Sequence, residues 1–168
     1  FILTLRISYI TRTILFLIFS LAMYWTTSAQ CDELAQQYYE KGEYKKAIIA
    51  FEKLYKQSPR KVNYFIAMIA SYQQLEDFET PEKLLLEAID VPKSNPMLLV
   101  ETGFNYDLKK DSINAKKYYE KAVQFTEAKV SASYIIGRSF EKKSLLDYAL
   151  RVYKSAMIEN PNYNFLNN

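Results

Sequence analysis

The residue types that usually perform chemistry are scarce in this sequence. The chain of 168 residues contains no histidine and one cysteine, Cys31. A serine–histidine–aspartate triad, a histidine-containing zinc site and a histidine general base are therefore excluded, and one thiolate cannot form a zinc cage. The three glycines are too far apart for a phosphate-binding loop. Adjacent acids such as Glu76 and Asp77 are expected at an exposed turn, so we expect no enzyme, no metal and no cofactor.

The composition favours one helical domain with a nearly neutral body. Only three glycines and five prolines occur among 168 residues, which favours helices over a many-stranded sheet. The formal net charge is +3, but residues 1–29 hold Arg6 and Arg12 and no acid. Removing these two from the 22 basic residues leaves 20 basic against 19 acidic residues. A nucleic-acid partner, which requires a concentrated basic face, is therefore not expected.

The segment 1–29 has the layout of a secretory signal peptide. The basic region ends at Arg12, an apolar run covers 14–25, and small residues precede a cleavage point after Ala29. The apolar run is shorter than the roughly 20 residues of a membrane-spanning helix. We expect export to the periplasm or cell envelope. Two alternatives stay open, an uncleaved membrane anchor and a lipid-modified Cys31, although Gln30 is unfavourable for lipidation.

Four rows of similar residues recur at a spacing of 34 positions. The rows are Tyr38, Tyr72, Tyr106 and Phe140; Ala47, Pro81, Ala115 and Ala149; Phe51, Leu85, Tyr119 and Tyr153; and Leu54, Ala88, Ala122 and Ala156. Within a unit the spacing is helical, and Gly42 lies where a first helix is expected to stop. Thr80 is predicted to cap a second helix, with Pro81 at its first position. Such a period indicates a helical repeat protein.

This pattern resembles the tetratricopeptide repeat (TPR) family, in an exported bacterial form. The family's small residue at the eighth place of each repeat corresponds to Ala35, Ile69, Gly103 and Gly137. The resemblance implies an all-α fold, a right-handed α-solenoid of about four helix-turn-helix hairpins at 30–61, 62–95, 96–129 and 130–163. Ile69 and Pro81 depart from the pattern, so the second unit is expected to pack with a local shift. Residues 164–168 are predicted to open a further repeat of a longer chain, the alternative being a frayed tail.

The resemblance also implies a binding groove, because the first helices of TPR units line a concave face. The matching residues here are Tyr39, Asn63, Ile66, Gln73, Met97, Val100, Phe104, Asp107, Tyr134, Arg138 and Glu141. The middle of this set is apolar and aromatic, which suits an extended peptide or a partner helix. Phe104 and Tyr134 could instead pack against the neighbouring repeat. The predicted function is a non-catalytic scaffold that binds a protein or peptide.

Some partners and roles are excluded or left open. Some TPR proteins hold a C-terminal carboxylate with a lysine, asparagine and arginine clamp. The matching positions here lack cations, so we do not predict this ligand; they are Asp32, Gln36, Asn63, Ala67, Met97 and Glu101. No nucleic acid and no small-molecule cofactor is expected, and a membrane only through an N-terminal anchor. The alternatives are an adaptor segment of a larger envelope or signalling protein whose active domain lies beyond residue 168, and a structural spacer.

Overall fold

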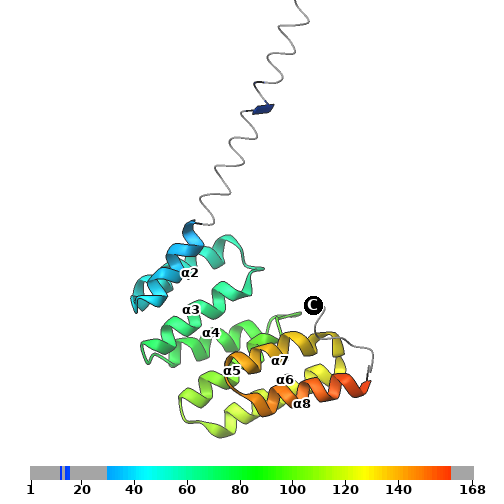
Figure 1. Cartoon of the computed structure of the whole chain (residues 1–168). Coiled ribbons are helices and arrows are strands. Elements are labelled where there is room, and N and C mark those ends of the chain that lie inside the picture. Colours follow the sequence, from blue (N-terminus) through cyan, green and yellow to red (C-terminus); the bar gives the residue numbers. More distant parts are fainter. Residues whose placement is uncertain (1–11, 13, 16–29, 160–168) are drawn as a thin grey trace, which may run out of the picture. The chain divides into compact units, whose positions relative to one another are not determined.

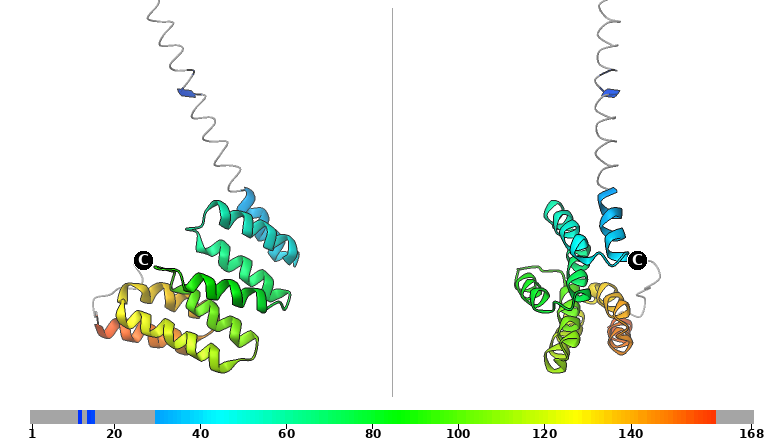
Figure 2. Two further views of the ribbon diagram at one scale, coloured as in Figure 1. Left: turned by 180° about the vertical axis from the view of Figure 1, so that it is seen from behind. Right: turned by 90° about the vertical axis from the view of Figure 1, so that its left-hand side faces the viewer.

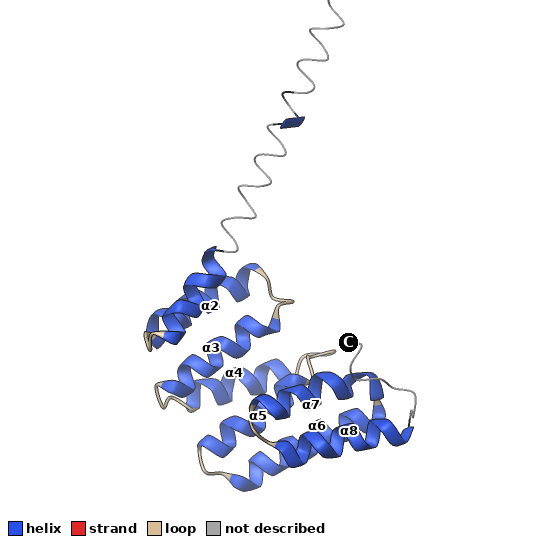
Figure 3. Ribbon diagram, viewed as in Figure 1, coloured by secondary structure: helices blue, strands red, loops and turns tan. Residues whose placement is uncertain are grey.

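Helices make up all the regular secondary structure in the described part of the chain (Figure 3). The computed structural model describes residues 12, 14–15 and 30–159. In this part no strand occurs, which confirms the all-α prediction. Apart from those three isolated residues, the predicted signal peptide lies outside the described residues, and so does the predicted opening of a further repeat at 164–168. None of the described helices combines the length and hydropathy that a membrane crossing requires.

The helices follow one another along the chain and are joined by short connections (Figure 1). Residues 30–40 are helical. They are followed by α2 (Tyr44–Gln57), α3 (Val62–Gln74), α4 (Glu79–Ile89), α5 (Met97–Leu108), α6 (Ser112–Ala128), the short 3-10 helix η1 (Val130–Ala132), α7 (Ser133–Lys142) and α8 (Leu146–Glu159). The chain divides into two compact units, residues 1–68 and 69–168, with the boundary inside α3. Each unit is described by itself below.

The turns that end the first helix of each pair share one backbone structure. The second residue after the helix has a left-handed conformation in all four turns: Gly42 (φ 74°), Glu76 (φ 59°), Lys110 (φ 63°) and Ser144 (φ 60°). The next backbone N–H donates to a carbonyl five residues earlier, in the pairs Glu43 to Tyr38, Asp77 to Tyr72, Asp111 to Tyr106 and Leu145 to Phe140. These are Schellman motifs, which satisfy carbonyls at a helix end. The period of the sequence is therefore a period of backbone geometry as well.

The second helix of a pair is capped differently from the prediction. The α4 helix begins at Glu79, and Asp77 accepts hydrogen bonds from Thr80 N at 3.0 Å and Thr80 Oγ1 at 2.8 Å. Asp77 is therefore the capping side chain, and the prediction of Thr80 was wrong. Pro81 is the third residue of α4, where its missing N–H has no intrahelical acceptor. Asp111 repeats this arrangement one period later, because it accepts from Asn114 N at 3.0 Å.

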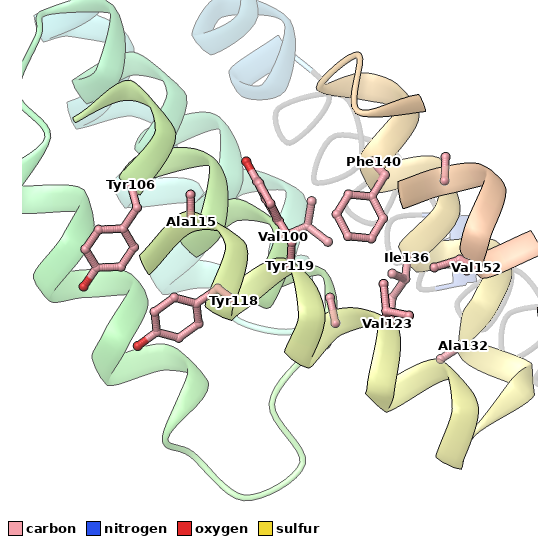
Figure 4. Close-up of a cluster of buried hydrophobic side chains, with 12 residues drawn as sticks. Val100, Tyr106, Ala115, Tyr118, Tyr119, Val123, Ala132, Ile136, Phe140 and Val152 are labelled. Atoms are coloured by element: carbon pink, nitrogen blue, oxygen red, sulfur yellow. The ribbon is translucent and has the colours of Figure 1, made fainter. Parts of the chain in front are cut away.

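The core of the second unit lies where two helical hairpins meet. The α5 helix packs on α6, α7 packs on α8, and both helices of the later hairpin contact α6. These hairpins lie side by side in every view (Figures 1 and 2). Ile136 and Phe140 of α7 point toward Val123 and Tyr119 of α6 (Figure 4). Most members of the four predicted rows are buried, while Tyr38, Tyr72, Ala88 and Tyr153 are half-buried.

Two helical glycines make the close approach inside these hairpins possible. A Cβ atom on Gly103 would lie 2.4 Å from Cε1 of Tyr119, and one on Gly137 would lie 2.3 Å from Cε1 of Tyr153. The two contacts are one period apart and equivalent. Because real Cβ atoms do not come this close to a ring carbon, the tyrosine occupies the space that a side chain would need. The glycine and the aromatic ring of each hairpin are therefore one packing unit.

The first unit is held by contacts between sequential helices. The Tyr64 hydroxyl of α3 donates to Asp32 Oδ2 at 2.6 Å, which joins α3 to the helix at 30–40. The rings of Tyr55 and Phe65 lie 5.2 Å apart, which joins α2 to α3. Ala35, at the small-residue position, is fully buried. Contacts of this kind bury aromatic area while leaving the tyrosine hydroxyl bonded.

Candidate binding face

Seven of the predicted groove residues lie on α5 and α7 in the second unit. We call these the α5/α7 set: Met97, Val100, Phe104, Asp107, Tyr134, Arg138 and Glu141. On each helix they recur at three- or four-residue spacing, which places them along one stripe. The α5 and α7 helices contact each other, so the two stripes lie close together in the second unit.

Two predicted residues are buried and do not fit a partner-facing role. Val100 is fully buried in the core cluster with Tyr119 and Ile136. Gln73 of α3 is buried as well, and its Nε2 donates to Asn105 Oδ1 at 3.1 Å. Asn105 is bonded in turn, because its own side-chain nitrogen Nδ2 donates to the carbonyl oxygen of Phe78 at 2.9 Å. Because buried amides need such partners, Gln73 serves the interior of the unit.

Phe104 is covered by a lysine from the following hairpin. Lys143 Nζ lies 4.3 Å from the centroid of the Phe104 ring and 2.8 Å from Glu101 Oε2. The side chains of Glu101 and Lys143 are 4% and 14% exposed. The contact with Oε2 is an ion pair without hydrogen-bond alignment. A cation over a ring face and beside a carboxylate is stabilised by both, so Phe104 packs against the neighbouring repeat while staying half-buried.

Both acids of the α5/α7 set are hydrogen-bonded by tyrosines of the same hairpin. The Tyr119 hydroxyl donates to Asp107 Oδ2 at 2.6 Å. Glu141 is the hydrogen-bond partner of Tyr153, which stands one period after Tyr119. Burial and then Asp107 raise the pKa of Tyr119 well above its usual range. Burial and then Glu141 raise the pKa of Tyr153 to about 12. Both phenols therefore stay protonated donors at neutral pH.

The remaining members of the set leave side-chain surface uncovered. Arg138 is exposed, and its Nη1 lies 2.8 Å from Glu141 Oε2. Met97 and Tyr134 are half-buried. The face thus offers one thioether, one phenol ring and a guanidinium–carboxylate pair. Surfaces of this mixture make contacts to proteins through aromatic and arginine side chains.

The predicted residues of the first unit have separate surroundings. The Tyr39 ring lies edge-on to Tyr44, with centroids 5.5 Å apart. Burial, followed by Tyr44, raises the pKa of Tyr39. Asn63 is exposed and Ile66 is half-buried on α3. These three residues keep surface that a partner can contact.

Sequence reasoning missed the lysines that follow the first helices. Lys109 forms ion pairs with Glu79, at 2.7 Å, and with Glu82, and the hydrogen bonds to these acids raise its pKa. Lys143 stands one period later and pairs with Glu101. Lys41 occupies the same register in the first unit. The recurrence of lysine at this place was a readable signal, but the partner acids follow no common period.

The described residues hold no cluster that could bind a metal ion, because no three histidine, cysteine, aspartate or glutamate side chains among them are close enough together. Cys31 is exposed. The two acids of the binding face, Asp107 and Glu141, contact tyrosine or arginine side chains, as described above. Such a face can bind a partner through shape, aromatic contact and charge.

Comparisons with known proteins place few limits on this chain. No protein-family model matches the sequence, and no curated protein matches it. A crystal structure of MamA is similar with a TM-score of 0.47 and 19% identity, covering 80% of this chain and 78% of that one. A second MamA structure gives a TM-score of 0.36 and 18% identity, covering 80% and 92%.

Proposed function

We propose that the chain is an exported, non-catalytic TPR scaffold, a right-handed α-solenoid whose first helices bind a protein or peptide. The observation that carries this proposal is a constant backbone with changing side chains. The four Schellman turns repeat at the period of the sequence. At equivalent places of α5 and α7, however, Phe104 is replaced by Arg138. Repeats that keep their packing residues and vary one face are typical of binding solenoids.

The bound segment is expected to contain an apolar or aromatic anchor. Tyr134 and Met97 offer half-buried apolar surface, and Arg138 with Glu141 offers a charged edge. Anchors of this kind carry most of the binding energy at protein interfaces. A partner helix or an extended peptide places such anchors at regular spacing.

Peptide selection with the full chain tests this proposal. Peptides selected from a displayed random library would be titrated against the chain by calorimetry. Tyr134→Ala and Arg138→Ala are each expected to weaken binding about tenfold or more, or by about 1.4 kcal/mol. Ile113→Ala changes an exposed side chain of α6 and serves as the matched control. Equal affinities for all four proteins would remove the binding face from α5 and α7.

Export is tested separately. Expression of the full chain in a bacterium, followed by fractionation and N-terminal mass spectrometry, is expected to give a periplasmic product that begins at Gln30. A product that retains residues 1–29 in the membrane fraction would support the anchor alternative. A cytoplasmic, full-length product would contradict export without affecting the peptide-binding test.

A further inference from the structure

An uncovered apolar stripe runs along α8, the last helix that the structure describes. Leu146, Leu150, Tyr153 and Met157 lie at i, i+4, i+7 and i+11, which places them on one side of the helix. Leu146 is 65% exposed, Leu150 51% and Met157 56%, and Tyr153 is half-buried. The stripe is about 16 Å long at the rise of an α-helix. Tyr153 packs on Gly137 of α7 with part of its ring, whereas among the described residues Leu146, Leu150 and Met157 stay exposed.

Stacking of repeats does not account for the two leucines. The positions one period before Leu146 and Leu150 are Ser112 and Lys116 of α6. Both remain exposed, although α7 and α8 pack directly against α6. A further hairpin in the same register would therefore leave positions 146 and 150 in water. Large apolar side chains at such positions are typical of an interaction surface.

The C-terminal half of the stripe, in contrast, lies at positions that the packing of successive repeats buries. The positions one period before Tyr153 and Met157 are Tyr119 and Val123, which the following hairpin buries. The stripe is thus longer than the area that one more hairpin would cover. An occupant that covers its whole length must run along α8, as a second helix does.

The charged residues beside the stripe indicate which kind of helix can pack on it. Asp147 and Lys154 are both exposed and lie seven residues apart on one flank of the stripe. Within residues 30–159, neither forms an ion pair. The other flank carries the small, buried residues Ala149 and Ala156. In an antiparallel pair of such helices the same flanks meet, so each aspartate lies against the lysine of the second copy.

A parallel pair would form no such contacts. In that orientation unlike flanks meet, so each charged residue would lie against an alanine. The antiparallel arrangement is also self-complementary, because a two-fold axis between the helices makes the same contact twice. The unpaired Asp147 and Lys154 thus complement the same two residues of a second α8 helix, in the antiparallel orientation.

We infer that the α8 stripe is a dimer interface, through which two copies of this chain associate with antiparallel α8 helices. Leu146 of one copy lies against Met157 of the second copy, and Leu150 lies against Tyr153. Asp147 pairs with Lys154 of the second copy at both ends of the seam. The seam is short, so the dimer is weak and depends on protein concentration.

A charge-reversal cycle tests both the partner and the orientation. Sedimentation equilibrium would be measured on the full chain in a mild, density-matched detergent. Cys31→Ser removes the chance of a disulfide between copies. The wild-type stripe is expected to give a monomer–dimer equilibrium. Asp147→Lys and Lys154→Asp alone each place like charges in contact twice, and are expected to raise the dissociation constant about tenfold or more.

The double variant Asp147→Lys/Lys154→Asp restores opposite charges and is expected to recover the dimer. Leu150→Asp is expected to abolish it, whereas Ile113→Asp, at an exposed isoleucine of α6, leaves it unchanged. A monomer at all concentrations would overturn the inference, and so would a double variant that stays dissociated. It would also be overturned if Leu146→Ser lowered the melting temperature of a monomer, because the stripe would then be covered within one chain.

Discussion

The ammonium group of Lys143 lies 2.8 Å from Oε2 of Glu101, and it also lies over the ring of Phe104. These residues come from two successive hairpins. The carboxylate is almost fully buried, and among the described residues its ion pair is with this lysine. The pair therefore fixes how α7 sits on α5.

Lys143→Met is expected to destabilise the protein. The substitution keeps an apolar chain over Phe104 but leaves the Glu101 carboxylate buried without a counter-ion, which is expected to lower the free energy of unfolding by about 2–4 kcal/mol. Urea unfolding followed by circular dichroism measures the change. Lys142→Met, at the exposed neighbouring lysine, is the control and should change stability by less than about 0.5 kcal/mol.

The double variant Glu101→Leu/Lys143→Met shows where the loss comes from. It removes both charges together, so its stability is expected to return to within about 1 kcal/mol of the wild type. If Lys143→Met alone were neutral, the buried ion pair would not be what holds the two hairpins.

Gly103→Ala is expected to destabilise the protein more than Gly137→Ala. An added Cβ meets the Tyr119 ring in the first case and the Tyr153 ring in the second. Tyr119 is buried and bonded to Asp107, so it cannot move aside, and we expect a loss of about 1–3 kcal/mol. Tyr153 is half-buried, and the three atoms nearest the Gly137 Cβ all belong to its side chain, whereas the Gly103 Cβ also meets the Ala115 carbonyl oxygen at 3.1 Å. Thermal melting of the two variants side by side gives the comparison, and equal losses would contradict it.

Glycine is expected to stabilise the left-handed turns that now hold other residues. Lys110→Gly and Ser144→Gly remove the clash of a Cβ atom with the backbone at positive φ, and each should raise the free energy of unfolding by about 0.5–1 kcal/mol. Both side chains are exposed, so little contact is lost. The reverse change, Gly42→Ala, has free space around its Cβ and should destabilise through backbone strain alone. Melting temperatures that fall for both glycine variants would refute the explanation.

Stability should fall in alkali through Tyr106. Burial, then the hydrogen bond to Glu82, raises the pKa of Tyr106 to about 12, while an unfolded tyrosine titrates near 10. The folded state thus keeps a proton that the unfolded state releases. The resulting stabilisation is complete below about pH 10 and is lost as the pH rises toward about 12.

Tyr106→Phe isolates this effect from the other tyrosines. At neutral pH the variant should be less stable by about 0.5–1.5 kcal/mol, because the hydrogen bond to Glu82 is lost. Above pH 10 the difference should shrink, because the wild type alone carries this titrating group. Urea unfolding at a series of pH values measures the difference, and a constant gap would count against the raised pKa.

The repeat was readable from the sequence because packing residues obey a strict spacing. Glycine at 103 and tyrosine at 119 recur as Gly137 and Tyr153, and the structure places each pair in contact. The glycine itself also indicated the turn at Gly42, because glycine adopts a positive φ without a steric penalty. The same turn at Lys110 was not predicted, because nothing in a lysine indicates a left-handed backbone.

The binding face was less readable because exposure depends on what packs alongside. Val100 and Tyr134 are equivalent in the repeat, yet the first is buried in the core and the second is half-buried. Position within one helix cannot distinguish them, since the covering side chains come from another hairpin. Lys143 escaped notice for the same reason, as its acid lies on the first helix of the preceding hairpin.

The identical turns at Lys110 and Ser144 limit how the length of this protein can change. Duplication of one whole period, such as residues 111–144, would join two equal backbone ends and leave every downstream contact in register. Insertion of one residue within α6 would instead rotate all that follows on that helix by about 100° and carry Tyr119 away from Gly103. The protein can therefore gain or lose residues without disturbing its packing only in steps of one whole hairpin.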